Sequence, residues 1–269
     1  MQALRSLGTV LIAGVLAGAA FVYSGLYDVS ATDQHLWPTY WTLRAAMERS
    51  IAVRADRVEV PALDVPERIR RGVGLYREHC AQCHGAPGVA PEPFALGMLP
   101  VPENLALVAR QRSAAEIYWT VRNGLKMTGM PAWQYRLSDD AMWDVVAFVK
   151  QLPKLSPAGY KALKPAPAAR AVEEAAAPDA ERGKQALRQY ACVTCHEIPR
   201  MVGSNAPVGP SLAHIAKRAF IAGVLPNTAE NMTRWVMAPQ EVKPGTAMPD
   251  LHMRVRDAKD IAAYLATLN

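Results

Sequence analysis

The chain has 269 residues, a length that allows one or two domains. Hydrophobic residues make up 51% and aromatic residues only 7%, which excludes a disordered chain and indicates modest cores that large buried cofactors would complete. The formal net charge of +6 comes from scattered basic residues without an aromatic-interleaved stripe, so we expect no nucleic-acid partner. The charge suits docking to an acidic protein or a membrane surface, or simply a solvated surface.

The first predicted element is a transmembrane helix. Leu7 to Tyr27 is an apolar run of 21 residues without a charge, long enough to cross a bilayer core of about 30 Å. Arg5 precedes the run, so the positive-inside rule places the N-terminus in the cytoplasm and everything after Asp28 outside. The alternative is a signal peptide cleaved near the small residues 17–19. We expect an uncleaved anchor over residues 1–28, because the run is longer than a usual signal core.

Residues 29–63 form the expected juxtamembrane helix and connector. Trp37, Tyr40 and Trp41 are rings of the type that lie at a membrane interface. A helical pattern begins at Pro38 and is expected to end before Asp56. Its apolar side needs a cover, which is either a partner protein or the domain that follows.

A pentapeptide motif occurs twice and contains all four cysteines of the chain, at residues 80–84 and 192–196. C-x-x-C-H is the signature for covalent attachment of haem c. Two thiols on one turn reach the haem vinyl groups, and the histidine becomes the proximal iron ligand. The alternatives are redox disulfides or zinc half-sites. A zinc ribbon needs its cysteine pairs about 15 to 20 residues apart, and these pairs lie a domain apart. We therefore predict two covalently bound haem c groups, on Cys80 and Cys83 and on Cys192 and Cys195, with His84 and His196 as iron ligands.

Residues 64–153 are predicted to form the first haem domain. Pro66 begins a helix that delivers Cys80 at its end, and Ser138 caps a closing helix that stops before Pro153. Between them we expect a loop over residues 85–102 that wraps one haem edge, and a short helix over 113–123.

The sixth iron ligand of this domain should follow that short helix. Two methionines are available, Met127 and Met130, and a thioether is a neutral ligand that raises the haem potential. We choose Met130, because Pro131 stiffens the loop after it and Gly129 permits close approach to the haem. Core packing is the alternative role for any methionine.

Residues 154–177 read as a linker rich in proline and alanine, extended or semi-stiff. A helix over 168–177 is an alternative within it. The sequence leaves open whether the two haem domains pack together or move independently.

Residues 178–269 repeat the order as a second haem domain. Asp179 starts a helix leading to the second motif, and Thr228 caps a later one. Met248, followed by proline, is predicted to be the axial ligand, and Met253 is the weaker alternative. Four other histidines are expected to be surface or loop residues: His35, His79, His214 and His252.

Each half therefore resembles a class I, mono-haem cytochrome c domain in its motif order. The resemblance implies a mainly α fold in which the first and last helices cross where a small residue meets an aromatic ring. Two pairs match this crossing, namely Gly72 with Phe148 and Gly183 with Tyr264. The family also orients its proximal histidine with a proline carbonyl, which implies Pro210 in the second domain and Pro102 in the first.

The second half is similar to the cytochrome c domain fused to subunit II of some haem-copper oxidases. The likeness rests on residues 222–228, on Trp235 and Pro239-Gln240, and on 243–249. The chain departs from that subunit because it shows no copper-binding cysteine and histidine cluster. The first half looks like membrane-anchored cytochromes of proteobacteria, a less diagnostic match.

These resemblances imply a membrane-anchored dihaem cytochrome c of the bacterial inner membrane, with both haems in the periplasm. We expect it to relay single electrons, with a terminal haem-copper oxidase as partner, and to be no enzyme by itself. One alternative is the cytochrome subunit of a periplasmic dehydrogenase. A dihaem peroxidase is less favoured, because six-coordinate iron has no open position for peroxide.

Overall fold

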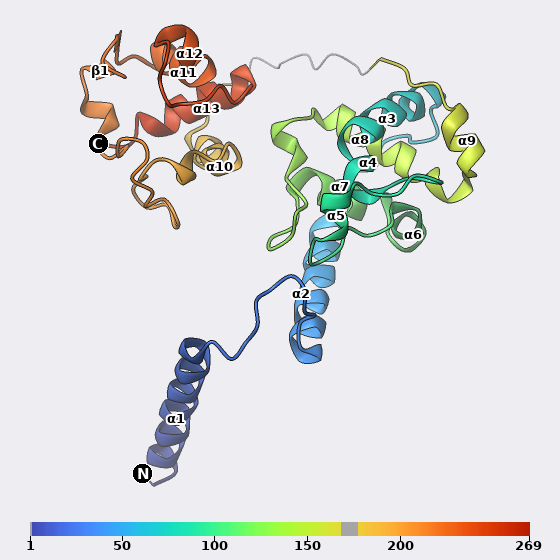
Figure 1. The fold of residues 1–269 in the computed structure, drawn as a ribbon, viewed down its shortest axis with the longest axis horizontal. Coiled ribbons are helices and arrows are strands. Elements are labelled where there is room, and N and C mark those ends of the chain that lie inside the picture. Colours follow the sequence, from blue (N-terminus) through green and yellow to red (C-terminus); the bar gives the residue numbers. More distant parts are fainter. Residues whose placement is uncertain (1, 168–176) are drawn as a thin grey trace.

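The computed structural model describes residues 2–167 and 177–269, which form helices connected by loops and one short hairpin (Figure 1). The predicted mainly α fold is confirmed. Two helices, α1 (Gln2–Ser24) and α2 (Trp37–Ala55), precede two small helical domains.

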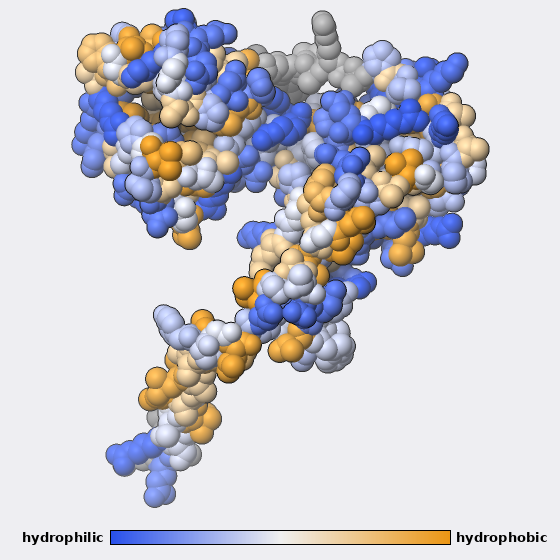
Figure 2. Space-filling model, viewed as in Figure 1, coloured by the Kyte–Doolittle hydropathy of each residue, from blue (hydrophilic) through white to orange (hydrophobic). Residues whose placement is uncertain are grey.

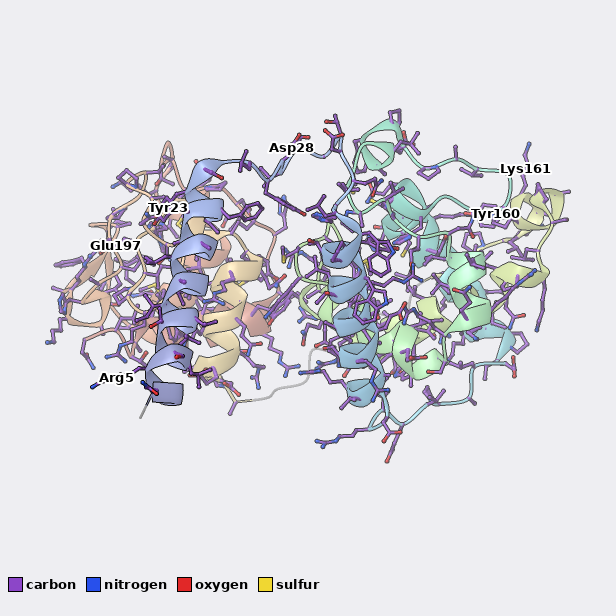
Figure 3. The ribbon with its side chains drawn as sticks, turned by 90° about the horizontal axis from the view of Figure 1, so that it is seen from below. Arg5, Tyr23, Asp28, Tyr160, Lys161 and Glu197 are labelled. Carbon is purple, nitrogen blue, oxygen red and sulfur yellow. The ribbon has the colours of Figure 1, made fainter. Side chains whose placement is uncertain are left out.

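Helix α1 is apolar, and its large apolar side chains between Leu7 and Tyr23 are exposed (Figure 2). Its segment Arg5–Ser24 has a mean hydropathy of 1.9, and among the described residues this is the one helix long and apolar enough to cross a membrane. Figure 3 shows Arg5 near one end of the helix and Tyr23 near the other. The helix stops before the predicted Tyr27, because Gly25 takes φ +68°, a left-handed conformation that ends helices.

Helix α2 agrees with the prediction, and only half of it is covered. Its C-terminal half packs on α7, with Ile51 and Ala55 buried. Of the two predicted covers, the first domain is therefore the right one for this half. Trp37 and Trp41 in the N-terminal half are 73% and 60% exposed.

The first domain is built on the crossing of its first and last predicted helices, α3 and α8. Gly72 makes this crossing possible, because a Cβ there would lie 2.0 Å from the carbonyl oxygen of Asp144 and 2.8 Å from Phe148 Cβ. The Gly72 and Phe148 pair is confirmed. The domain's elements are α3 (Pro66–His79), α4 (Ala81–His84), α5 (Pro93–Leu96), α6 (Leu105–Gln111), α7 (Ala114–Asn123), η1 (Trp133–Tyr135), α8 (Asp139–Val149), η2 (Leu152–Lys154) and α9 (Pro157–Ala162).

The second domain repeats this crossing with α10 and α13. A Cβ on Gly183 would lie 1.9 Å from the carbonyl oxygen of Asp260, which is one turn before Tyr264. Asp179 and Thr228 cap their helices as predicted. The elements are α10 (Ala180–Gln189), η3 (Cys192–Thr194), η4 (Ile215–Lys217), β1 (Phe220–Ile221), β2 (Leu225–Pro226), α11 (Ala229–Met237), α12 (Pro239–Val242) and α13 (Val255–Leu265).

The first part of the predicted linker packs on the first domain. Tyr160 lies on α9 (Figure 3), and its ring is buried. The backbone carbonyl of Tyr160 accepts a hydrogen bond from Arg77 Nη2 at 2.8 Å. Further on, the Ala166 N–H donates to the Arg70 carbonyl at 3.1 Å. Leu155, Tyr160 and Leu163 explain this, because they pack in or against the hydrophobic core of the first domain. The alternative helix over 168–177 lies outside the described residues except for its last position.

Candidate haem sites

One helical turn gathers each cysteine pair and its histidine. In the first motif the N–H groups of Cys83 and His84 donate to the Cys80 carbonyl at 3.1 and 2.9 Å. In the second motif the His196 N–H donates to the Cys192 carbonyl at 2.9 Å. All four cysteines are free, and within the described ranges no three His, Cys, Asp or Glu side chains gather around a metal position.

Each histidine predicted to be a proximal ligand is held by a backbone carbonyl. His196 Nδ1 lies 2.8 Å from the Pro210 oxygen, as predicted. His84 Nδ1 lies 2.7 Å from the Glu103 oxygen, so the assignment of Pro102 is wrong by one residue. A carbonyl only accepts, so Nδ1 carries the proton and Nε2 is left with the lone pair that can bind a metal.

Burial keeps these groups in their neutral forms. Burial lowers the pKa of His84, against the opposing effect of the Glu103 carbonyl, and so favours the neutral imidazole that binds metals. Burial also raises the pKa of Cys80 to about 12 and that of Cys192 to about 11. Both of these thiols are therefore protonated at neutral pH.

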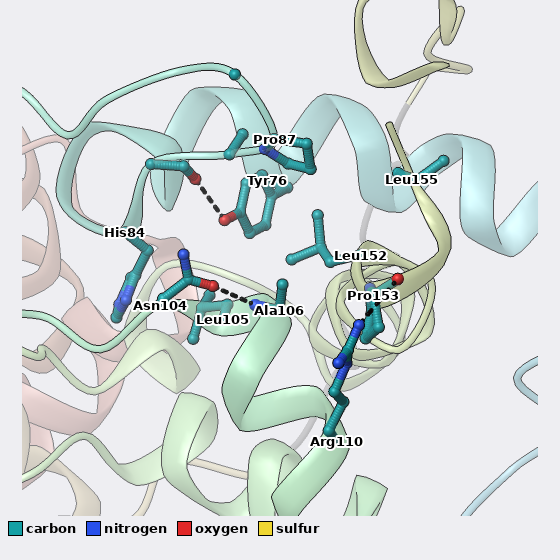
Figure 4. A pocket seen from close by; sticks show the side chains of 13 residues that line it. Tyr76, His84, Pro87, Asn104, Leu105, Ala106, Arg110, Leu152, Pro153 and Leu155 are labelled. Atoms are coloured by element: carbon teal, nitrogen blue, oxygen red, sulfur yellow. Dashed lines mark hydrogen bonds between the residues drawn. The ribbon is translucent and has the colours of Figure 1, made fainter. Parts of the chain in front are cut away.

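A cavity of about 340 Å³ borders His84 (Figure 4). Its wall includes the residues that follow Glu103, beginning with Asn104, whose side chain caps α6. On the opposite wall the Tyr76 hydroxyl donates to the Gly85 carbonyl at 2.6 Å. The Tyr76 hydrogen bond anchors the loop directly after the motif. The Asn104 cap anchors the helix that follows Glu103, whose carbonyl orients His84.

Met130 is positioned by hydrogen bonds of its own loop. Its N–H donates to Thr128 Oγ1 at 3.1 Å, and its carbonyl accepts from the Leu125 N–H at 3.2 Å. The Met130 side chain is half-buried against the first core. Met127 is 83% exposed and has φ +59°, so its side chain is directed to solvent.

Met248 is held in a similar loop, with a side chain in place of the backbone donor. Gln240 Nε2 donates to the carbonyls of Thr246 and Met248 at 2.7 and 2.8 Å. The Met248 side chain is half-buried, whereas Met253 is 6% exposed and lies within the hydrophobic core. The sequence analysis predicts no role for Gln240. The one feature that could have drawn attention to this residue is its place in the oxidase-like stretch.

A third methionine, Met98, packs on one of these loops, and no sequence pattern predicts this contact. Met98 Sδ lies 3.0 Å from the position that a Cβ on Gly129 would take, so its thioether packs against the loop of Met130. The four remaining histidines have other neighbours or lie exposed. His35 pairs with the Tyr27 hydroxyl, His79 packs on Trp133, and His214 and His252 are exposed.

Comparison with protein families identifies the class of both domains. Residues 67–149 match the model described as "Cytochrome C oxidase, cbb3-type, subunit III", and residues 180–269 match the model described as "Cytochrome c". The chain therefore carries two cytochrome c domains, a class that binds haem c covalently.

Part of the chain is similar to subunits of respiratory oxidases. A cytochrome c oxidase subunit 2 of Alkalihalophilus pseudofirmus is 34% identical over 36% of this chain and 28% of its own length. The subunit 2 of Bacillus subtilis is 29% identical over 32% of this chain and 24% of its own length. The chain thus spans about a quarter of the relatives it matches. A reducing HAO-like protein complex of Kuenenia stuttgartiensis aligns over 78% of this chain and 99% of its own, at 19% identity and a TM-score of 0.28, a level that carries no argument.

Proposed function

We propose that the protein is a membrane-anchored dihaem cytochrome c that relays single electrons to a terminal haem-copper oxidase. The supporting observation is that each domain offers one oriented imidazole and one half-buried thioether. Such a pair leaves a haem iron six-coordinate, without a position for substrate, which favours electron transfer over catalysis.

The proposed attachment sites are Cys80 and Cys83 for one haem c, and Cys192 and Cys195 for the other. The proposed iron ligands are His84 with Met130 and His196 with Met248. A bound haem c supplies a one-electron couple between ferric and ferrous iron. The chain supplies the orientation, since backbone carbonyls fix both imidazoles and loop hydrogen bonds fix both methionines.

The proposed location is the periplasmic face of a bacterial inner membrane. The apolar helix α1 supports an anchor, and Arg5 before it supports the cytoplasmic side for the N-terminus. The oxidase is proposed as the acceptor because the relatives are named as oxidase subunits, which extends their setting to this chain.

The test is oxygen uptake by the purified oxidase of the same membrane, with the reduced protein as sole electron donor. We expect uptake that is proportional to the amount of protein and stops when the protein is fully oxidised. Reduced protein that stays reduced beside an active oxidase rules out this acceptor.

Ligand variants serve as the control. Met130→Ala and Met248→Ala should each lower the potential of one haem, because a neutral thioether ligand raises it. Met127→Ala is the matched control, since this methionine is in the same loop but exposed. If neither potential changes in the first two variants, the ligand assignment is wrong.

A further inference from the structure

A short segment after Met130 lies between the two proposed haem attachment sites. The Trp133 ring of η1 is 5.1 Å from the imidazole of His79, the residue directly before Cys80. Two residues on, the Tyr135 carbonyl accepts a hydrogen bond at 3.1 Å from the Tyr190 hydroxyl. Tyr190 is two residues before Cys192. The three-residue turn η1 therefore contacts a residue just before each of the two cysteine motifs, namely His79 and Tyr190.

The second domain binds the carbonyl groups of this segment. Arg254 Nη2 donates to the Gln134 carbonyl at 2.7 Å, and Nη1 reaches the Leu137 carbonyl at 3.4 Å. The buried carboxylate of Asp257 accepts from Arg254 Nε at 3.1 Å and from the Tyr190 hydroxyl at 2.8 Å. Arg254 thus joins the Asp257 carboxylate to two carbonyls of the first domain, while Tyr190 shares its single hydroxyl proton between Asp257 and the Tyr135 carbonyl.

Apolar packing accompanies these hydrogen bonds. Ala132 and Tyr135 belong to the first domain in sequence, yet they are buried in the hydrophobic core cluster of the second. The Tyr135 hydroxyl donates to Gln185 Oε1 at 3.2 Å, and the Arg136 guanidinium lies 4.3 Å above the Tyr190 ring. Burial of apolar side chains, a cation–π contact and hydrogen bonds together hold the domains in contact.

We propose that residues 132–137 form a bridge that fixes the two haem sites relative to each other, so that electrons pass between them within one chain. The inference rests on the proposed function, since it requires both haems. The path from Met130 runs along five residues to Tyr135, crosses one hydrogen bond to Tyr190, and reaches Cys192 two residues later. Arg254 is a positioning residue in this scheme, whereas Tyr190 lies on the path itself.

The test is the rate of electron transfer between the haems of the isolated full-length protein after a flash reduces one of them. Arg254→Ala removes the donors to two carbonyls, and Tyr190→Phe removes the hydroxyl alone. In each variant we expect the rate of electron transfer between the haems to be about tenfold lower than in the unmodified protein, because small misplacements of reacting groups slow reactions strongly. Arg254→Lys should recover part of the rate, since an ammonium keeps the charge but lacks the planar fork.

Arg218→Ala is the matched control, because this arginine donates to the carbonyls of Ser211 and Ala213 within the second domain. Haem content, absorption spectra and both potentials should be unchanged in the bridge variants, while small-angle X-ray scattering shows a more extended molecule. An unchanged transfer rate in Tyr190→Phe and Arg254→Ala overturns the bridge. If Arg254→Ala loses its second haem, Tyr190→Phe alone decides.

The oxidase proposal fails separately, because this rate is measured without any partner. Fewer than two haems in the unmodified protein would instead contradict the proposed function itself.

Discussion

The two domains cross their first and last helices alike, but they satisfy the buried carboxylate at the crossing differently. In the first domain Arg71 binds Asp144 through Nε at 2.6 Å and Nη2 at 3.0 Å. A second arginine, Arg68, places Nη1 3.4 Å from the same carboxylate. Asp144 is fully buried, so two cations stand against one buried charge.

In the second domain one arginine acts with a backbone group. Arg182 binds Asp260 through Nε at 2.8 Å and Nη2 at 3.0 Å, and the Asp179 N–H donates to Asp260 at 2.7 Å. Asp260 is 1% exposed. The Arg-Gly pair of the first domain thus has a second arginine beside its carboxylate, whereas in the second domain a backbone N–H donates to the carboxylate. A buried charge that loses its partner is costly, so the two crossings should differ in tolerance.

The largest expected effect comes from the glycines that both crossings share. Gly72→Ala and Gly183→Ala place a Cβ about 2 Å from a carbonyl oxygen, so the helices must separate, at a cost of about 3 kcal/mol or more. Each variant should lose the haem of its own domain, so that the haem content falls from two to one. Gly74→Ala is the control on the same helix. Its Cβ would lie 3.3 Å from the Pro165 Cβ, a much milder contact than that of Gly72 with a carbonyl oxygen. Retention of both haems by both crossing variants would contradict the role of the crossing.

The arginines should separate the two domains. Arg182→Ala removes both guanidinium hydrogen bonds to the buried Asp260, and we expect a loss of about 3 kcal/mol in the unfolding free energy. Arg71→Ala leaves Arg68 in place, and we expect about 1 to 2 kcal/mol. Hydrogen exchange of peptides from each domain measures the two values separately. The exposed Arg70, paired with Glu67, is the control and should change stability by less than about 1 kcal/mol. Equal losses at Arg71 and Arg182 would show that Arg68 provides no reserve.

The smallest effect concerns the methionine loops. Gln240→Ala frees two carbonyls in the second domain and should make Met248 easier to displace by about 1 kcal/mol, because two hydrogen bonds are lost. Added imidazole should then bind the ferric second haem several times more tightly, while the first haem is unaffected. Gln111→Ala, at the exposed end of α6, is the control. Unchanged imidazole affinity would mean that Gln240 does not secure the loop.

Local signals in the sequence account for much of the fold. Caps and periodic apolar residues predict the helices that end at Cys80 and begin after Ser138, because these patterns act within a few residues. Pro210 follows from the family pattern and is confirmed. In the first domain the same pattern indicates Pro102, and the carbonyl that meets His84 is that of the next residue, Glu103. A shift of one residue in a proline-rich loop leaves no trace in the composition.

Contacts between distant residues could not be predicted. Nothing in the spacing of Tyr135, Tyr190 and Arg254 indicates that they meet, since these contacts join residues 55 to 120 positions apart. The packing of α9 on α3 was hidden for a related reason. A stretch rich in proline and alanine resembles a linker. Whether it packs on a domain depends on the distant residues that Tyr160 meets, which here are Arg77 and Phe148.

The connection between α1 and α2 has a consequence for encounter with a partner. Twelve residues, 25–36, separate the two helices, and a fully extended chain of this length reaches about 40 Å. If α1 is embedded as proposed, this connection keeps the start of α2 within about 40 Å of the bilayer and tethers the haem domains beyond it to the membrane. Their search for a partner in the same membrane then proceeds along a surface, at an effective concentration far above that of a free cytochrome.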